Sequence, residues 1–107
     1  MPGAVTDATT ELLRALRGQV EGRAEFVLEK VTSRRWASIT FTGARHEVRF
    51  RIEGDEAGEV AGRFVAGAAA AEFAMRGHLL ADLAVVAEER VPGGVRIALE
   101  ALTVEDA

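Results

Sequence analysis

The chain of 107 residues contains no cysteine, no tyrosine and no asparagine, and lysine occurs only once. Without cysteine, the chain has no disulfide bond, no thiol nucleophile and no thiolate metal site. Its two histidines, His46 and His78, lack the spacing of a zinc-binding pair, and there is no glycine-rich phosphate loop. We therefore predict no metal site and no cofactor, and we assign no catalytic residue from the sequence.

Long apolar segments are also absent. The first twenty residues contain acids and no apolar run of the kind found in signal peptides, and no segment approaches the roughly 18 to 20 apolar residues of a membrane span. We expect a cytoplasmic protein that does not associate with membranes. Arginine outnumbers lysine twelve to one, a bias typical of a GC-rich, bacterial genome.

A chain of this length is expected to fold as one domain over residues 1–107, with residues 1–5 disordered. Apolar residues at helical spacing predict a first helix after Thr6 or Asp7 and a second over residues 56–71. The apolar residues of the first helix are Leu12, Leu13, Leu16 and Val20. Those of the second are Val60, Ala61, Phe64, Val65 and Ala68.

Strand-forming residues fill 25–31, and a hairpin is predicted next. Thr42-Gly43-Ala44-Arg45 places glycine first in a two-residue loop, as a type II′ turn requires. This turn would direct Ile39, Phe41, His46, Val48 and Phe50 to one apolar face and set Trp36 opposite Arg51 on the other. On that face His46 would be a partly buried structural histidine.

Two further strands close the predicted fold. Alternating apolar residues predict a long strand over 73–91, and residues 91–95 predict a three-residue connection to a last strand. The order helix, three strands, helix, two strands predicts an α+β domain with a five-stranded, mainly antiparallel sheet packed against two helices. This order is similar to that of the class I secretion chaperones, whose short acidic chains dimerise. The similarity is one of topology without a shared motif, so function is argued from particular residues.

Positive charge is concentrated between Lys30 and Arg51, where six basic residues and one acid give +5 in a chain of net charge −4. Such a distribution can orient a protein toward an anionic partner. The predicted register brings Trp36 within cation–π distance of Arg51. We predict a surface that binds an acidic protein segment or another anionic ligand, formed by Trp36, Arg49, Arg51, Arg34, Arg35 and Arg45. The single exposed aromatic residue and the acidic total disfavour nucleic acid.

The last hairpin is apolar on both faces. Opposite its alternating row lie five further apolar residues, namely Leu80, Ala84, Val86, Leu102 and Val104. A helix or a second copy of the chain must cover them, and we predict a homodimer through these residues. The function predicted is thus that of a non-enzymatic, homodimeric binding or adaptor domain. The alternative is a small-ligand enzyme or sensor whose pocket, between the second helix and strand 73–91, has His78 and Asp82 at its rim.

Overall fold

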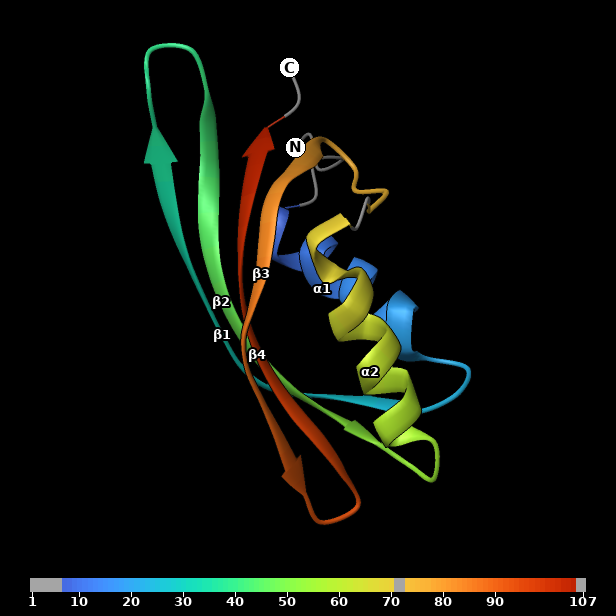
Figure 1. Cartoon of the computed structure of the whole chain (residues 1–107). Helices are drawn as coiled ribbons and strands as arrows, with labels where there is room; N and C mark the ends of the chain where they lie inside the picture. The colour runs from blue at the N-terminus through green and yellow to red at the C-terminus, as the bar shows by residue number, and fades with distance from the viewer. Residues whose placement is uncertain (1–6, 71–72, 106–107) are drawn as a thin grey trace.

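The computed structural model describes residues 7–70 and 73–105. Its elements are α1 (Ala8–Val20), β1 (Glu25–Ala37), β2 (Thr42–Glu53), α2 (Ala57–Gly67), the short 3-10 helix η1 (Ala68–Ala70), β3 (His78–Val91) and β4 (Gly94–Glu105). The four strands form one antiparallel sheet in the order β1-β2-β4-β3. Both helices lie on the same face of this sheet (Figure 1). The α+β class is confirmed, whereas the fifth strand is wrong.

The helices form where the apolar spacing predicts them. Asp7 caps α1 by accepting a hydrogen bond of 2.7 Å from the backbone N–H of Thr10. Leu12, Leu16 and Val20 are buried on the side of α1 that faces the sheet. Two predictions lie outside the described residues, namely the disorder of residues 1–5 and the end of the second helix at residue 71.

The core lies between the helices and the two central strands, β2 and β4. Phe50 stacks on Phe26 of β1 at 4.7 Å between ring centroids and meets the ring of Phe64 of α2 edge-on at 5.6 Å. Alternate residues of the central strands are buried beneath the helices; they are His46, Val48, Phe50 and Ile52 on β2, and Val95, Ile97, Leu99, Ala101 and Thr103 on β4. The intervening residues therefore point to the opposite face.

The predicted turn at Gly43 and Ala44 is wrong. The strands pair up to Ala37 and Thr42, and the loop between them consists of residues 38–41. Ser38 closes this loop, because its backbone N–H donates to the carbonyl of Phe41 at 2.7 Å and its hydroxyl accepts from the N–H of Phe41 at 3.0 Å. The two short strands expected on either side of the glycine are thus parts of two longer ones, which accounts for the missing strand.

Gly43 lies inside β2, opposite Trp36, and does not have a positive φ. A side chain there would collide with the backbone carbonyl of Thr103 on β4 and with the indole of Trp36, whose Cζ2 would lie 2.8 Å from a Cβ atom. Glycine is therefore needed for close approach of its neighbours and not for a turn.

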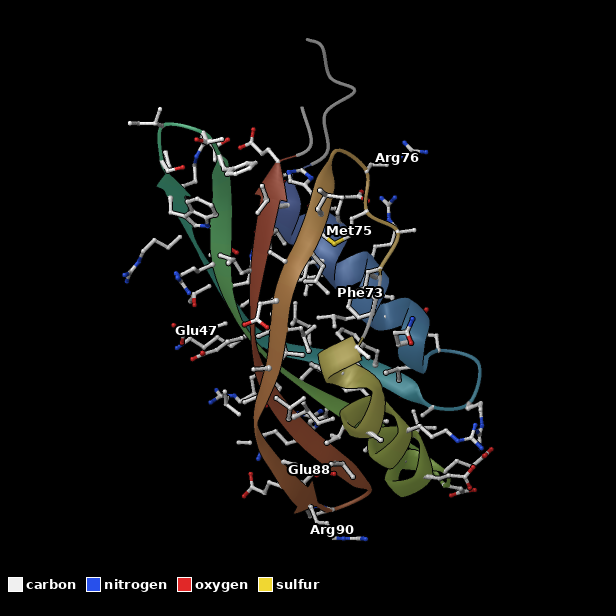
Figure 2. The ribbon with its side chains drawn as sticks, turned by 45° about the horizontal axis from the view of Figure 1, so that its top comes forward. Glu47, Phe73, Met75, Arg76, Glu88 and Arg90 are labelled. Carbon is white, nitrogen blue, oxygen red and sulfur yellow. The ribbon has the colours of Figure 1, made fainter. Side chains whose placement is uncertain are left out.

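The long strand predicted over 73–91 begins only at His78, after Gly77 turns the chain with a φ of +71°. Phe73 and Met75 precede it and pack against the core beside α1 (Figure 2). The pairing of β3 with β4 shifts between Leu80 and Asp82 and again between Val85 and Ala87, so two bulges interrupt the predicted row. The connection to β4 is the two-residue Pro92-Gly93, one residue shorter than predicted.

Candidate binding surface on the open face of the sheet

The face of the sheet turned away from α1 and α2, here called the open face, carries the side chains that alternate with the core. Figure 2 shows Glu47 of β2 on this side, pointing away from the helices. The pairing places Trp36, Arg34, Arg45, Arg49 and Arg51 on the open face. Arg35 lies on the opposite side, because it pairs with the buried Ala44.

A cluster around Glu29, here called the Glu29 cluster, comprises Glu29, Arg49, Arg51 and Arg96. The register shift between Leu28 and Lys30 is a bulge at Glu29, and its carboxylate accepts 2.7 Å hydrogen bonds from both Arg51 Nη1 and Arg96 Nε. Arg49 Nε lies 3.3 Å from the same carboxylate. The Glu29 side chain is only 14% exposed. A single acid thus contacts three cations from two neighbouring strands.

Hydrogen bonds from Arg96, and then from Arg51, lower the pKa of Glu29 to about 2. Two more acids help to neutralise the arginines of the cluster. Arg51 also pairs with Glu53 at 2.6 Å, and Arg96 pairs with Glu89 at 3.1 Å. The predicted pairing of Trp36 with Arg51 is wrong: Arg51 lies opposite Val27, nine positions along β1 from the tryptophan.

The part of the β1–β2 hairpin farthest from α2, residues 30–48, is here called the arm. Figure 1 shows its loop end standing clear of both helices. Its basic residues are Lys30, Arg34, Arg35 and Arg45, and its one acid is Glu47. Arg34 and Arg45 are directly opposed across the two strands, both are exposed, and neither forms a salt bridge within the described residues. Arg35, 80% exposed, lies 3.7 Å from Glu105. Like charges at opposed positions destabilise a sheet. Because Glu47 is its one acid, the arm carries positive charge with little internal compensation.

Two apolar side chains at the loop of the arm belong to the surface although the sequence does not predict them there. Ile39 is fully exposed and Phe41 is 55% exposed, although the predicted turn directed both to the core. Ser38 is the residue that could have predicted this loop, since a serine hydroxyl that accepts from a nearby backbone N–H stabilises a turn without glycine. The indole of Trp36 lies against Gly43 beneath this loop, and its Nε1 is buried with no hydrogen-bond partner among the described residues.

On the helix side of the arm, His46 is almost fully buried, whereas the sequence predicts a partly buried histidine. Its Nδ1 lies 2.7 Å from the hydroxyl of Ser33, which in turn lies 2.7 Å from that of Thr9 on α1. Its Nε2 lies 2.9 Å from the hydroxyl of Thr103. Burial lowers the pKa of His46, which favours the neutral ring. The network joins the arm to the start of α1.

The residues predicted to form the dimer interface lie on both faces of the sheet. Ala84, Leu102 and Val104 belong to the open face of β3 and β4, and Val86, at the second bulge, is 56% exposed. Leu80 pairs with the buried Thr103 and packs against the core, so it lies on the helix side. The bulge between Leu80 and Asp82 also places His78 and Asp82 on opposite faces, which separates the two residues of the alternative pocket.

Comparison with known proteins finds no matching family model, no matching curated protein and no matching solved structure. Among residues 7–70 and 73–105, no group of three or more histidine, aspartate or glutamate side chains could hold a metal ion. In the same residues, no helix has the length and apolarity to cross a membrane. Function is therefore inferred from the chemistry of the open face and of the arm.

Proposed function

We propose that this chain is a non-enzymatic binding protein that holds an acidic protein segment against its arm. The observation that carries the proposal is the difference in charge compensation between the Glu29 cluster and the arm. Arg49, Arg51 and Arg96 are occupied by acids of the chain itself, whereas Lys30, Arg34 and Arg45 have no such partner among the described residues. Exposed guanidinium groups supply the planar donors that a carboxylate accepts.

The apolar loop gives this surface a second kind of contact. Ile39 and Phe41 lie at the end of the same arm, next to Trp36, and large exposed apolar residues in a soluble fold favour contact with a partner. A segment with both acidic and apolar residues would satisfy the charges and cover the loop. Aromatic and arginine side chains dominate the binding energy of many protein interfaces, and the arm offers both.

Fluorescence anisotropy with a labelled peptide of alternating glutamate and valine tests the proposal. The variant Arg34→Glu/Arg45→Glu should bind this peptide about tenfold more weakly or worse, because attraction becomes repulsion. The control Arg63→Glu/Arg90→Glu changes the net charge equally at two exposed sites away from the arm. It should keep its affinity within about threefold of wild type.

Other anions decide between an acidic protein segment and its competitors. Polyglutamate, single-stranded DNA, and vesicles of phosphatidylserine and phosphatidylcholine serve as probes in parallel. Equal binding of all of them would reduce the arm to a nonspecific polycation site and overturn the proposal. Binding to the vesicles alone, lost in Ile39→Ser/Phe41→Ser, would identify a lipid surface as the partner instead.

We further propose that the chain forms a homodimer through the apolar part of the open face, formed by Ala84, Val86, Leu102 and Val104. These side chains leave β3 and β4 uncovered on the side without helices, and two-fold pairing of like surfaces is the commonest closed assembly. Light scattering should give a mass near twice 11.4 kDa, the mass of one chain, at micromolar concentration. Val86→Glu should reduce the mass toward one chain without unfolding it. A wild-type mass of one chain at every concentration contradicts the dimer.

A further inference from the structure

The two edges of the sheet differ in how well they could accept another strand. β1 and β3 are the edge strands. β3 is interrupted by two bulges, which twist an edge and block further pairing. β1 has one bulge, at Glu29, and then pairs without interruption over eight residues from Lys30 to Ala37. The regular part of the β1 edge is thus the strand segment of the arm itself.

The hydrogen bonds of the loop determine which backbone groups of β1 point outward. The N–H of Ser38 donates to the carbonyl of Phe41, which marks this pair as a hydrogen-bonded position of the hairpin. In an antiparallel pair, hydrogen-bonded and non-hydrogen-bonded positions alternate. The backbone groups of Trp36 and Arg34 therefore point toward β2, whereas those of Ala37, Arg35, Ser33 and Val31 point away from it. None of these outward groups pairs with another strand within the described residues.

We infer that β1 receives the acidic segment as an added fifth strand, paired with the outward backbone groups between Val31 and Ala37. The inference rests on the function proposed above and specifies how the segment binds. Strand addition obtains its affinity from main-chain hydrogen bonds and its selectivity from side chains that alternate between the two faces. The partner is an extended protein segment rich in acidic residues.

The charges of β1 select this occupant over a second copy of the chain. Lys30 and Arg34 project to the open face and Arg35 to the helix side, so both sides of an added strand would meet positive charge. Two copies of β1 paired edge to edge would oppose these same cations, and like charges across strands are unfavourable. An acidic strand would instead find a cation on each side. The charges on the β1 edge thus disfavour pairing with a second copy of β1 and favour pairing with an acidic segment.

The decisive experiment keeps the side chains of the probe and removes its main-chain donors. The labelled glutamate–valine peptide is compared with the same peptide N-methylated at alternate residues, so that one edge of the peptide loses its donors. Two such peptides are made, one for each edge. The peptide methylated on the edge that faces β1 should bind about tenfold more weakly or worse, whereas the peptide methylated on the other edge should change the affinity by less than about threefold. Equal binding of all three peptides would overturn strand addition.

A matched pair of protein variants tests the same contact from the other side. Arg35→Ala and Arg35→Pro both remove the guanidinium, but only proline removes the outward N–H, and proline is tolerated on an edge strand where its nitrogen faces solvent. Arg35→Pro should bind the unmodified peptide several-fold more weakly than Arg35→Ala, with the same circular dichroism spectrum. Equal affinities of the two folded variants would contradict the pairing.

The outcomes distinguish this inference from the proposed function. If the peptide binds and charge reversal at Arg34 and Arg45 abolishes binding, while N-methylation has no effect, then the arm binds acidic segments by side chains alone. In that case the function stands and strand addition fails. If wild-type protein binds none of the acidic peptides, the proposed function itself fails.

Discussion

The Glu29 cluster and the arm share strands β1 and β2 and both contain arginines, yet they differ in chemistry. In the cluster, one carboxylate at a bulge reaches three arginines from β2 and β4. In the arm, Arg34 and Arg45 face each other with no acid in contact within the described residues. The charge available to a partner therefore depends on where the acids of the chain point and not on the number of cations in a segment.

The bulge is the physical cause of this difference. An extra residue in β1 lies unopposed between Leu28 and Lys30, and that residue is Glu29. In a regular strand, neighbouring residues would point to opposite faces. The bulge instead puts the carboxylate beside the open-face arginines Arg51 and Arg96. Beyond it, β1 continues regularly and has no acid in the whole stretch from Lys30 to Ala37.

The largest expected effect comes from Gly43→Val, which would disrupt the arm and leave the Glu29 cluster intact in composition. A valine there collides with the carbonyl of Thr103 and with the indole of Trp36, and β4 cannot move away without breaking its pairing with β2. We expect a loss of more than ~2 kcal/mol in the free energy of unfolding, measured by urea denaturation.

Gly62→Ala is the control for this substitution. Gly62 lies in α2, and a Cβ atom there would meet no other atom within 4 Å. Alanine should therefore stabilise the helix by up to about 1 kcal/mol. A neutral Gly43→Val would mean that the close packing of Trp36, Gly43 and Thr103 is incorrect.

The next effect concerns the cluster. Glu29→Gln keeps the shape of the side chain but removes the charge that three arginines share, so the melting temperature at pH 7 should fall by several degrees. The same variant should bind the glutamate–valine peptide more tightly than wild type, because it exposes a second group of unneutralised cations. Asp82→Asn is the control, because Asp82 is an exposed acid opposite Leu102 on the same face, and it should change neither property appreciably. Unchanged peptide affinity in Glu29→Gln would show that the compensation by Glu29 does not set the difference between the two regions.

Acid titration should separate the two regions by pH. The pKa of His46 is lowered by burial below 6.5, so the unfolded chain binds protons more readily and stability falls as the pH decreases below about 6.5. The pKa of Glu29 is lowered from 4.5 to about 2, so its contribution is present above pH 4.5 and is lost as the pH falls toward 2. Thermal melts should therefore show two declines. The first should flatten in His46→Gln and the second in Glu29→Gln; a profile that neither variant alters contradicts both assignments.

Much of the fold follows from local signals in the sequence. The spacing of Leu12, Leu16 and Val20 is sufficient to predict α1, and the alternation of Val95, Ile97 and Leu99 is sufficient to predict β4 and its buried face. The turn of this hairpin is mispredicted because Gly43 matches the glycine that a type II′ turn requires at its first loop position. Its actual role is to let β4 and Trp36 approach, and no local pattern reveals the contact with the carbonyl of Thr103, 60 positions away.

The site was predictable only in part for a similar reason. The basic residues between Lys30 and Arg51 identify the hairpin that carries the surface, and Arg34 and Arg45 belong to it. Glu29 precedes this basic segment, and its effect depends on a bulge and on Arg96 from the far end of the chain. Register and bulges thus determine which cations stay available, and both are properties of the paired strands and not of either strand alone.

The smallest expected effect compares the stability cost of the two groups of arginines. Arg34→Thr removes one of two like charges opposed across β1 and β2, and such cross-strand pairs change stability by about 0.2–1 kcal/mol. This variant should raise the melting temperature slightly, whereas Arg49→Thr, which removes a partner of Glu29, should lower it. In 1 M salt, where screening acts over roughly 3 Å, the gain from Arg34→Thr should disappear. A melting temperature that falls in both variants would mean that the arm, like the cluster, has its charge compensated within the chain, and the contrast on which the proposed function depends would be lost.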